Sequence, residues 1–156
     1  MADKTAMANT VYTTVCKALD ERKWNYEKDE EKKVVHFGVN GDDIPMKLVI
    51  KVDEDRQLLQ ILSPLTFKMP EDKRVDGAIA ACMVSYGMAD GNFDYDLSDG
   101  RIVFRMTHPF HDSVIGVGAI QYMISCTCAM VDKYNDKFLA LSKGLIDISG
   151  FIKKEQ

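Results

Sequence analysis

The sequence predicts an α+β domain with an antiparallel sheet of about five strands and the element order α-β-β-β-α-β-β-α. Residues 44–52 alternate between apolar and polar side chains, which is typical of a strand with one buried face. Apolar residues recur every three or four positions near both ends of the chain, which predicts amphipathic helices. No internal repeat or linker rich in Gly, Ser or Pro divides the 156 residues, so we expect one domain over 1–156, with an ordered core at about 5–144.

The first helix is expected over residues 5–22. Its apolar residues fall on one stripe at helical spacing. This stripe consists of Met7, Val11, Val15, Ala18 and Leu19.

Two strands are expected next, over residues 33–39 and 44–52. Asn40-Gly41 follows the first of them, and this dipeptide favours the positive φ angles of a tight hairpin turn. The two strands should therefore pair antiparallel.

The third strand, residues 57–63, is apolar on both sides. Leu58 and Leu62 share one side, and Leu59 and Ile61 share the other. Since helices cover only one face of a sheet in a small α+β domain, the second apolar side suggests a further layer or another molecule.

A second helix is expected to begin at Pro70, which is suited to a first helical turn. Gly87 is expected to end it in a left-handed conformation. The stripe that should face the core is Val75, Ile79, Cys82, Met83 and Tyr86.

A hairpin of strands 92–96 and 101–107 follows, with Asp and Arg side chains that should pair across its wet face. A long third helix is expected over 112–144, with Asp112 or Ser113 as its N-cap. Its first half is apolar nearly all round. Either other helices of the chain cover this surplus, or a second subunit or partner does.

Charge and cysteine content exclude several classes of protein. The 20 Lys and Arg residues are scattered among 24 Asp and Glu residues, for a net charge of −4, whereas nucleic-acid binding needs clustered positive charge. The four cysteines lie in apolar helical patterns and the N-terminus lacks an apolar signal, so we expect a reducing, cytoplasmic location. The uncharged residues 113–131 are long enough to span a membrane, but they are diluted by polar residues and glycine, and we expect no membrane insertion.

No motif supports catalysis, a metal or a cofactor. His108 and His111 have a zinc-like spacing, but Pro109 keeps them off a helix and no third ligand is evident. The acidic residues 94–100 resemble a calcium loop, yet Arg105 replaces the glutamate that such a loop needs. Gly116 and Gly118 lack the remainder of a dinucleotide fingerprint. An enzyme with a site assembled from distant residues is left as a third possibility, behind binding and sensing.

Two stretches carry a resemblance to a known family. They are residues 67–74, FKMPEDKR, and residues 91–105, GNFDYDLSDGRIVFR. Together with the element order, they resemble the YbjN-like family of bacterial proteins, whose fold is similar to that of class I type III secretion chaperones. The resemblance covers about residues 10–140. It implies a domain that is often dimeric, binds polypeptide and catalyses nothing; some members are labelled sensory transduction regulators.

We therefore expect a non-enzymatic, chaperone-like protein-binding or regulatory module that forms a homodimer and binds a polypeptide of unknown identity. The alternative is a small-molecule sensor with a pocket between helix and sheet. The residues expected to contact the partner are Leu59, Ile61, Leu65 and Phe67. Those expected at the oligomer contact are Val117, Ile124 and Val131. Packing within the chain is the other explanation for each of these side chains.

Overall fold

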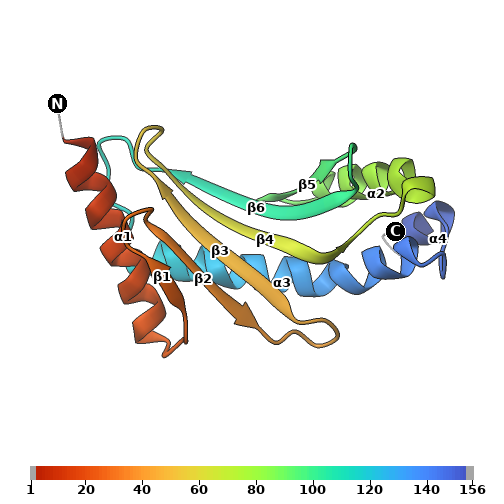
Figure 1. Cartoon of the computed structure of the whole chain (residues 1–156), viewed down its shortest axis with the longest axis horizontal. Helices are drawn as coiled ribbons and strands as arrows, with labels where there is room; N and C mark the ends of the chain where they lie inside the picture. Colours follow the sequence, from red (N-terminus) through yellow and green to blue (C-terminus); the bar gives the residue numbers. More distant parts are fainter. Residues whose placement is uncertain (1–2, 154–156) are drawn as a thin grey trace.

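The computed structural model describes residues 3–153 and contains one six-stranded antiparallel sheet with the strand order β1-β2-β3-β4-β6-β5 (Figure 1). The strands are β1 Glu27–Asp29, β2 Val34–Val39, β3 Met46–Asp53, β4 Leu58–Lys68, β5 Asn92–Asp96 and β6 Arg101–Pro109. The helices are α1 Lys4–Glu21, the 3-10 turn η1 Glu71–Lys73, α2 Arg74–Tyr86, α3 Val117–Ser142 and α4 Ile148–Lys153.

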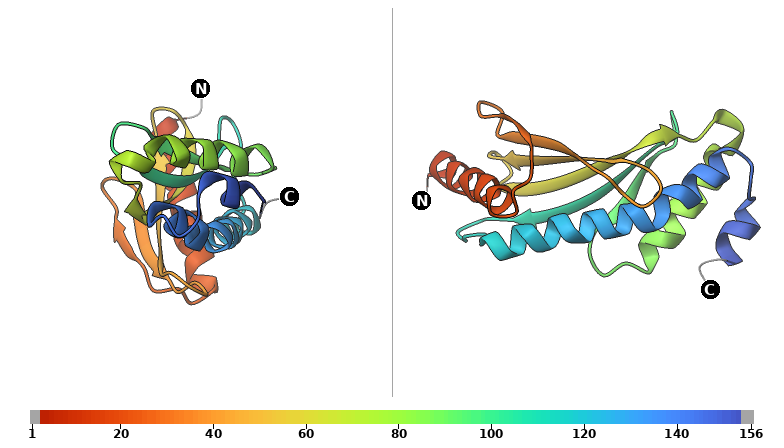
Figure 2. Two further views of the ribbon diagram at one scale, coloured as in Figure 1. Left: turned by 90° about the vertical axis from the view of Figure 1, so that its right-hand side faces the viewer. Right: turned by 90° about the horizontal axis from the view of Figure 1, so that it is seen from below.

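The helices lie on one face of this sheet. α3 runs along the sheet, α1 crosses near one end, and α2 and α4 lie at the other end (Figures 1 and 2). The strands alternate accordingly: every second residue of β3 is buried against the helices, and the residues between them point to the opposite, bare face. The buried core positions of the central strands are Leu48, Ile50, Leu59, Ile61, Ile102 and Phe104.

The sheet has one strand more than predicted. β1 is only three residues long, and its sequence, Glu-Lys-Asp, has no apolar alternation. Its backbone pairs with the first half of β2, with Glu27 opposite His36 and Asp29 opposite Val34. Because the side chains contribute no apolar pattern, the sequence contains no signal for this strand.

β4 is the central strand and is longer than predicted. It runs to Lys68, pairs with β3 on one side and with β6 on the other, and changes register after Pro64. Proline lacks the N–H that continues a ladder, which accounts for an irregularity at this point.

The connection between β2 and β3 is not the predicted tight turn. Six residues separate the strands, and Gly41 has no positive φ. Gly41 instead lies against α3, where an added Cβ would collide with the carboxylate of Asp132. That carboxylate also accepts a hydrogen bond of 2.8 Å from the backbone N–H of Asp42. The glycine is therefore required by close packing, against Asp132 of α3 and against the backbone carbonyl oxygen of Ile44 at 2.9 Å, and not by a positive φ.

The ends of α2 and α3 also differ from the prediction. Gly87 caps α2 with a φ of −84° and not in the left-handed region. α3 begins at Val117 after Gly116, without a side-chain cap, and Asp112 lies in the preceding turn with a φ of 48°. The predicted N-cap was therefore placed several residues too early, because the turn after Pro109 continues to Gly116.

The unpredicted helix α4 extends the core beyond residue 144. Phe151 is fully buried, and its ring centroid lies 5.4 Å from that of Phe138 on α3. A six-residue helix is too short for a clear periodic pattern, so its apolar anchor is visible only in the structure.

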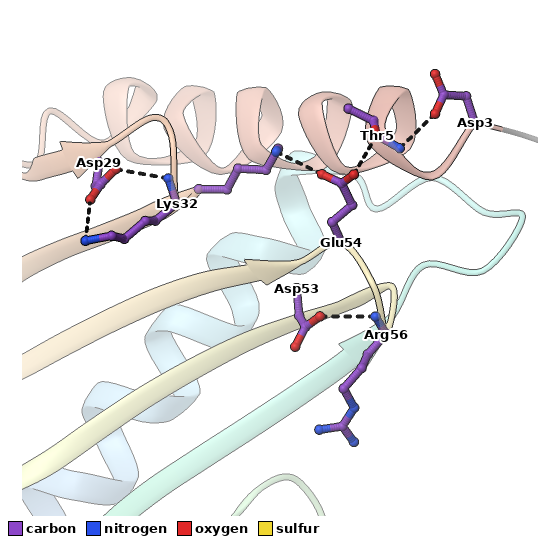
Figure 3. Close-up of polar contacts among 8 residues, drawn as sticks. Asp3, Thr5, Asp29, Lys32, Asp53, Glu54 and Arg56 are labelled. Atoms are coloured by element: carbon purple, nitrogen blue, oxygen red, sulfur yellow. Dashed lines mark hydrogen bonds and ion pairs between the residues drawn. The ribbon is translucent and has the colours of Figure 1, made fainter.

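Glu54 joins three segments at the start of α1. Its carboxylate accepts a 2.5 Å hydrogen bond from the hydroxyl of Thr5 and a 3.0 Å contact from the ammonium of Lys33 (Figure 3). Asp3 caps α1 through the backbone N–H of Thr5. The Thr5 hydroxyl, followed by Lys33, lowers the pKa of Glu54. The β3–β4 turn thus holds the first turn of α1 against the β1–β2 turn.

Substitution of Gly41 by alanine should destabilise the protein. The added Cβ would push the loop away from Asp132 and remove its hydrogen bond to Asp42, which we expect to cost about 1–3 kcal/mol. Urea unfolding followed by circular dichroism measures this cost. Gly118→Ala is the matched control, because no atom lies within 4 Å of a Cβ at that exposed helical position. An equal loss in both variants would contradict the packing role of Gly41.

Replacement of Glu54 by glutamine should lower the melting temperature at pH 7, and this difference should diminish as the pH is lowered towards 3. The folded state lowers the pKa of Glu54, so its stabilising effect is present above the unfolded-state pKa and is lost as the pH falls through the folded-state value. Thermal unfolding of both proteins across this pH range tests the prediction. A melting difference that did not change with pH would show that the charge of Glu54 is not what stabilises α1.

Candidate functional site

The outer face of α2 is the most apolar exposed helix surface in the described chain. Val75 is 66% exposed, Ile79 41% and Tyr86 94%, and Cys82 between them is also exposed. These four residues follow one another at helical spacing, and we call them the α2 stripe. The sequence prediction that this stripe faces the core is wrong.

The opposite face of α2 explains this orientation. It buries the small residues Gly77, Ala80 and Ala81, together with Val84. A Cβ at Gly77 would lie 2.6 Å from Met69 and 2.7 Å from the hydroxyl of Tyr95, so only glycine allows α2 to approach the sheet this closely. α2 therefore packs on the sheet through its small residues, and its larger apolar side chains remain exposed to water.

The tip of the β5–β6 hairpin lies beside the start of α2. The backbone N–H of Met69 donates to the carbonyl of Gly100 over 2.9 Å, which fixes the hairpin against this segment. Leu97 at the tip is 57% exposed. α2 and this hairpin tip lie at the same end of the molecule (Figure 1), so this end presents exposed apolar side chains from both a helix and a hairpin.

The bare face of the sheet has an apolar centre and a charged periphery. Leu58 and Leu62 of β4 point to this face and are half-buried, as are Val49 and Val103 on the neighbouring strands. Polar contacts flank them: Arg105 forms an ion pair with Asp94 at 2.8 Å, which confirms the predicted pairing across the hairpin, and the imidazole of His36 lies 2.8 Å from the carboxylate of Glu27. An apolar centre inside a polar rim is the general composition of a protein interface.

The residues predicted to contact a partner divide into two groups. Leu59 and Ile61 are fully buried beneath the helices, because they lie on the covered side of β4. Leu65 and Phe67, after the register change of β4, are half-buried and line a narrow crevice together with Val131. The apolar residues of β4 that do point to a free face are Leu58 and Leu62. Because both sides of this strand are apolar, the sequence does not indicate which side faces outwards.

The residues predicted for oligomerisation lie mostly inside the chain. Ile124 and Val131 are buried and Val117 is half-buried. α3 packs against α1, α2, α4 and three strands, so neighbouring elements of the same chain account for much of its apolar surplus. Its outward face contains Tyr122 and several small residues.

Ionisable groups do not form a recognisable reactive cluster in residues 3–153. No group of three or more His, Cys, Asp or Glu side chains in this part could hold a metal ion. Burial, reinforced by Asp132, raises the pKa of Cys128 to about 11, and burial also raises the pKa of Cys126. Both thiols are thus protonated, and weakly nucleophilic, at neutral pH.

The long uncharged segment before Asp132 does not have the character of a membrane span. Within the described residues, no helix combines the length and the apolarity needed to cross a bilayer.

Truncation of neighbouring β4 residues should distinguish the two faces of the sheet. Ile61→Ala should lower the free energy of unfolding by about 2–5 kcal/mol, because it opens a cavity beneath the helices. Leu62→Ala on the bare face should lower it by less than about 1.5 kcal/mol. Urea unfolding of the two variants measures both values, and equal losses would mean that the bare face is covered in solution.

Comparison with known proteins supports the fold. No family profile and no curated protein matches the chain. Among solved structures, a chain of the HopA1–SchA chaperone–effector complex is 14% identical, with a TM-score of 0.51 over 81% of this chain and 94% of that one. A chain of the ExsC–ExsE complex is 8% identical, with a TM-score of 0.59 over 83% and 94%.

The third similar structure is YbjN from E. coli, a candidate transcription regulator. It is 8% identical, with a TM-score of 0.62 over 85% of this chain and 92% of that one. At such low sequence identities, the structural similarity establishes the fold alone. The chain therefore has the YbjN-like, secretion-chaperone-like α+β fold that the sequence predicted, with six strands in place of five.

Proposed function

We propose that this protein is a non-enzymatic, chaperone-like protein-binding module that works as a homodimer in the cytoplasm. The α2 stripe is the observation that carries the proposal. Similarity to chains from two complexes between proteins supports a polypeptide partner. The four free cysteines are consistent with a reducing compartment.

The stripe is suited to contact with another protein. Single exposed apolar residues are common, but a row of them along three turns of a helix is not. α2 has no charged residue after Asp76, so no charge opposes contact along most of its length. Full burial of a valine or isoleucine side chain contributes about 1.5–3 kcal/mol, so several such residues together can stabilise an association.

A second copy of the chain is the occupant that we propose for the stripe. In a two-fold dimer the same surface serves both subunits, so an apolar stripe meets an apolar stripe. Antiparallel packing of two α2 helices would place the two copies of Cys82 near the symmetry axis, between Ile79 of one subunit and Ile79 of the other. Leu97 would extend the contact at either end.

The bare face of the sheet remains available for a polypeptide in such a dimer. Leu58 and Leu62 supply its apolar centre. Leu65 and Phe67 lie on the side of β4 that faces α3, where they line the crevice with Val131 and remain partly exposed to a partner. Leu59, Ile61, Ile124 and Val131 are already covered within the chain, so contact through them would require the helices to move.

A small-molecule sensor is the second candidate function. A groove of about 250 Å³ lies between α1 and the segment before α3, and Met7, Val11, Val114 and Ile115 contribute to it. The hydroxyls of Thr10 and Thr14, which also line it, already donate to backbone carbonyls of α1. Few free polar groups are left to orient a ligand, which makes this function the weaker candidate.

Measurement of molar mass tests the dimer. We expect the wild-type protein to have the mass of a dimer in light scattering, and Ile79→Asp to have that of a monomer, because a charge in the centre of the stripe cannot be solvated in the contact. Val114→Asp is the matched control: it is 83% exposed, lies outside the α2 stripe and should leave the mass unchanged.

Alkylation of Cys82 supplies a second measurement. Its rate should fall as protein concentration rises, because dimerisation covers the thiol, and Ile79→Asp should remove this dependence. A monomeric wild-type protein at all concentrations, with Cys82 freely reactive throughout, would contradict the proposed dimer.

A further inference from the structure

The outer edge of β2 is only half covered. β1 pairs with Val34, Val35 and His36, and no described strand pairs with the outer side of Phe37, Gly38 and Val39. On the inner side, these three residues pair with β3. Backbone groups along an open edge can form a ladder with an added strand.

A hollow of about 480 Å³ lies at this open edge. It forms because the chain diverges from β2 before β1 begins, and it is bounded by Tyr26 and Glu27 on one side and by His36, Gly38 and Lys47 on the other. Trp24 supports the floor from below, with its ring 5.1 Å from that of Phe37 in an edge-to-face contact. The hollow therefore has a rigid base and an open side.

Gly38 is not required by the fold. It has no positive φ, and the nearest atom to a Cβ at this position would be a backbone oxygen at 3.9 Å, which is an ordinary contact. Glycine within a strand weakens that strand because it adds backbone entropy and packs no side chain. A strand glycine that no contact or backbone conformation within the chain requires is typical of a place where another backbone approaches closely.

Lys47 supplies a cation beside this notch. It lies directly opposite Gly38 in the β2–β3 register, its side chain is exposed, and it forms no ion pair within residues 3–153. The nearby carboxylate of Glu27 is 2.8 Å from the imidazole of His36. The carboxylate of Glu27 is thus already paired with a neighbour, whereas the ammonium of Lys47 is available to an acidic group of another molecule.

We infer that an extended, acidic segment of a partner polypeptide binds here, adds a strand to the open edge of β2 across Gly38, and places a carboxylate against Lys47. This inference rests on the proposed protein-binding function and deepens it by assigning a site and a chemistry to the partner. A second copy is the poorer occupant, because its own edge strand β2 contains no acidic side chain and presents the same lysine opposite Gly38.

Fluorescence anisotropy with defined peptides tests the site. The probe is a short labelled peptide that alternates valine and threonine around a central glutamate; companion probes have lysine in place of the glutamate or N-methyl groups on the backbone. The protein should bind the acidic probe, and both companion probes should bind at least about tenfold more weakly.

Two variants locate the binding. A Cβ at residue 38 would meet no atom closer than 3.9 Å, so Gly38→Val should be tolerated, with a melting temperature at or above that of the wild type, and should weaken binding of the acidic probe at least about tenfold. Lys47→Glu should have a similar effect and should reverse the preference towards the lysine probe. Lys51→Glu is the control, because this lysine lies on the same strand and face but opposite Val34 and outside the hollow.

Three outcomes would overturn the inference. One is that no probe binds, and another is that the acidic probe binds Gly38→Val and Lys47→Glu as well as it binds the wild type. The third is that Gly38→Val lowers the molar mass, which would identify the edge as a contact between copies. None of these outcomes depends on the α2 stripe. If Ile79→Asp abolishes the dimer, the proposed dimer is supported whatever the probes do. If the protein is always monomeric but binds the probes as expected, only the proposed dimer is disproved.

Discussion

The removal of one face of a single sheet from water is the constraint on which the remaining structure depends. α1, α2 and α3 cover that face, α3 along most of its length, and α4 packs in turn on α2 and α3 (Figure 2). Because no helix or strand among the described residues covers the other face, the core is one sheet-to-helix interface, filled from the helix side by α1, α3 and the small residues of α2. The apolar residues that this interface cannot accommodate are left on the outer surfaces.

Two surfaces follow from this constraint. α2 packs so closely through Gly77 and Ala81 that its larger side chains point outwards. On the other face of the sheet, which no helix of the described residues covers, Leu58 and Leu62 are only half-buried. Neither surface contains the convergent polar groups expected of a catalytic site, which is why the proposals concern partners and not substrates.

Patterns that depend on the nearest neighbours in the chain predicted the fold well. The stripe of α1 and the alternation of β3 both gave the correct buried face, because each element has polar residues on its other side. The Asp–Arg pairs of the last hairpin were also predictable, since strand register fixes which side chains meet.

Features that depend on the tertiary approach of distant elements were not predictable. The exposed stripe of α2 contains larger apolar side chains than the buried face, so periodicity selects the wrong face. Gly77 faces the sheet because Met69 and Tyr95 lie so close to it that no side chain fits there. Gly41 has the sequence context of a tight turn, yet its role is set by Asp132, far along the chain. The two sides of β4 are equally apolar, so the sequence could identify an unusual strand but not its outward side.

The central pairing of β4 with β6 has a consequence for how the chain reaches this structure. β1 to β4 form a meander of sequential neighbours, whereas Leu58 must find Pro109 across an intervening helix and strand. The entropy lost on closing such a loop is not compensated until the pairing forms, so this step should limit the speed of folding. A nascent chain would complete the meander first and, until β6 emerges, would expose the far edge of β4 to chance association.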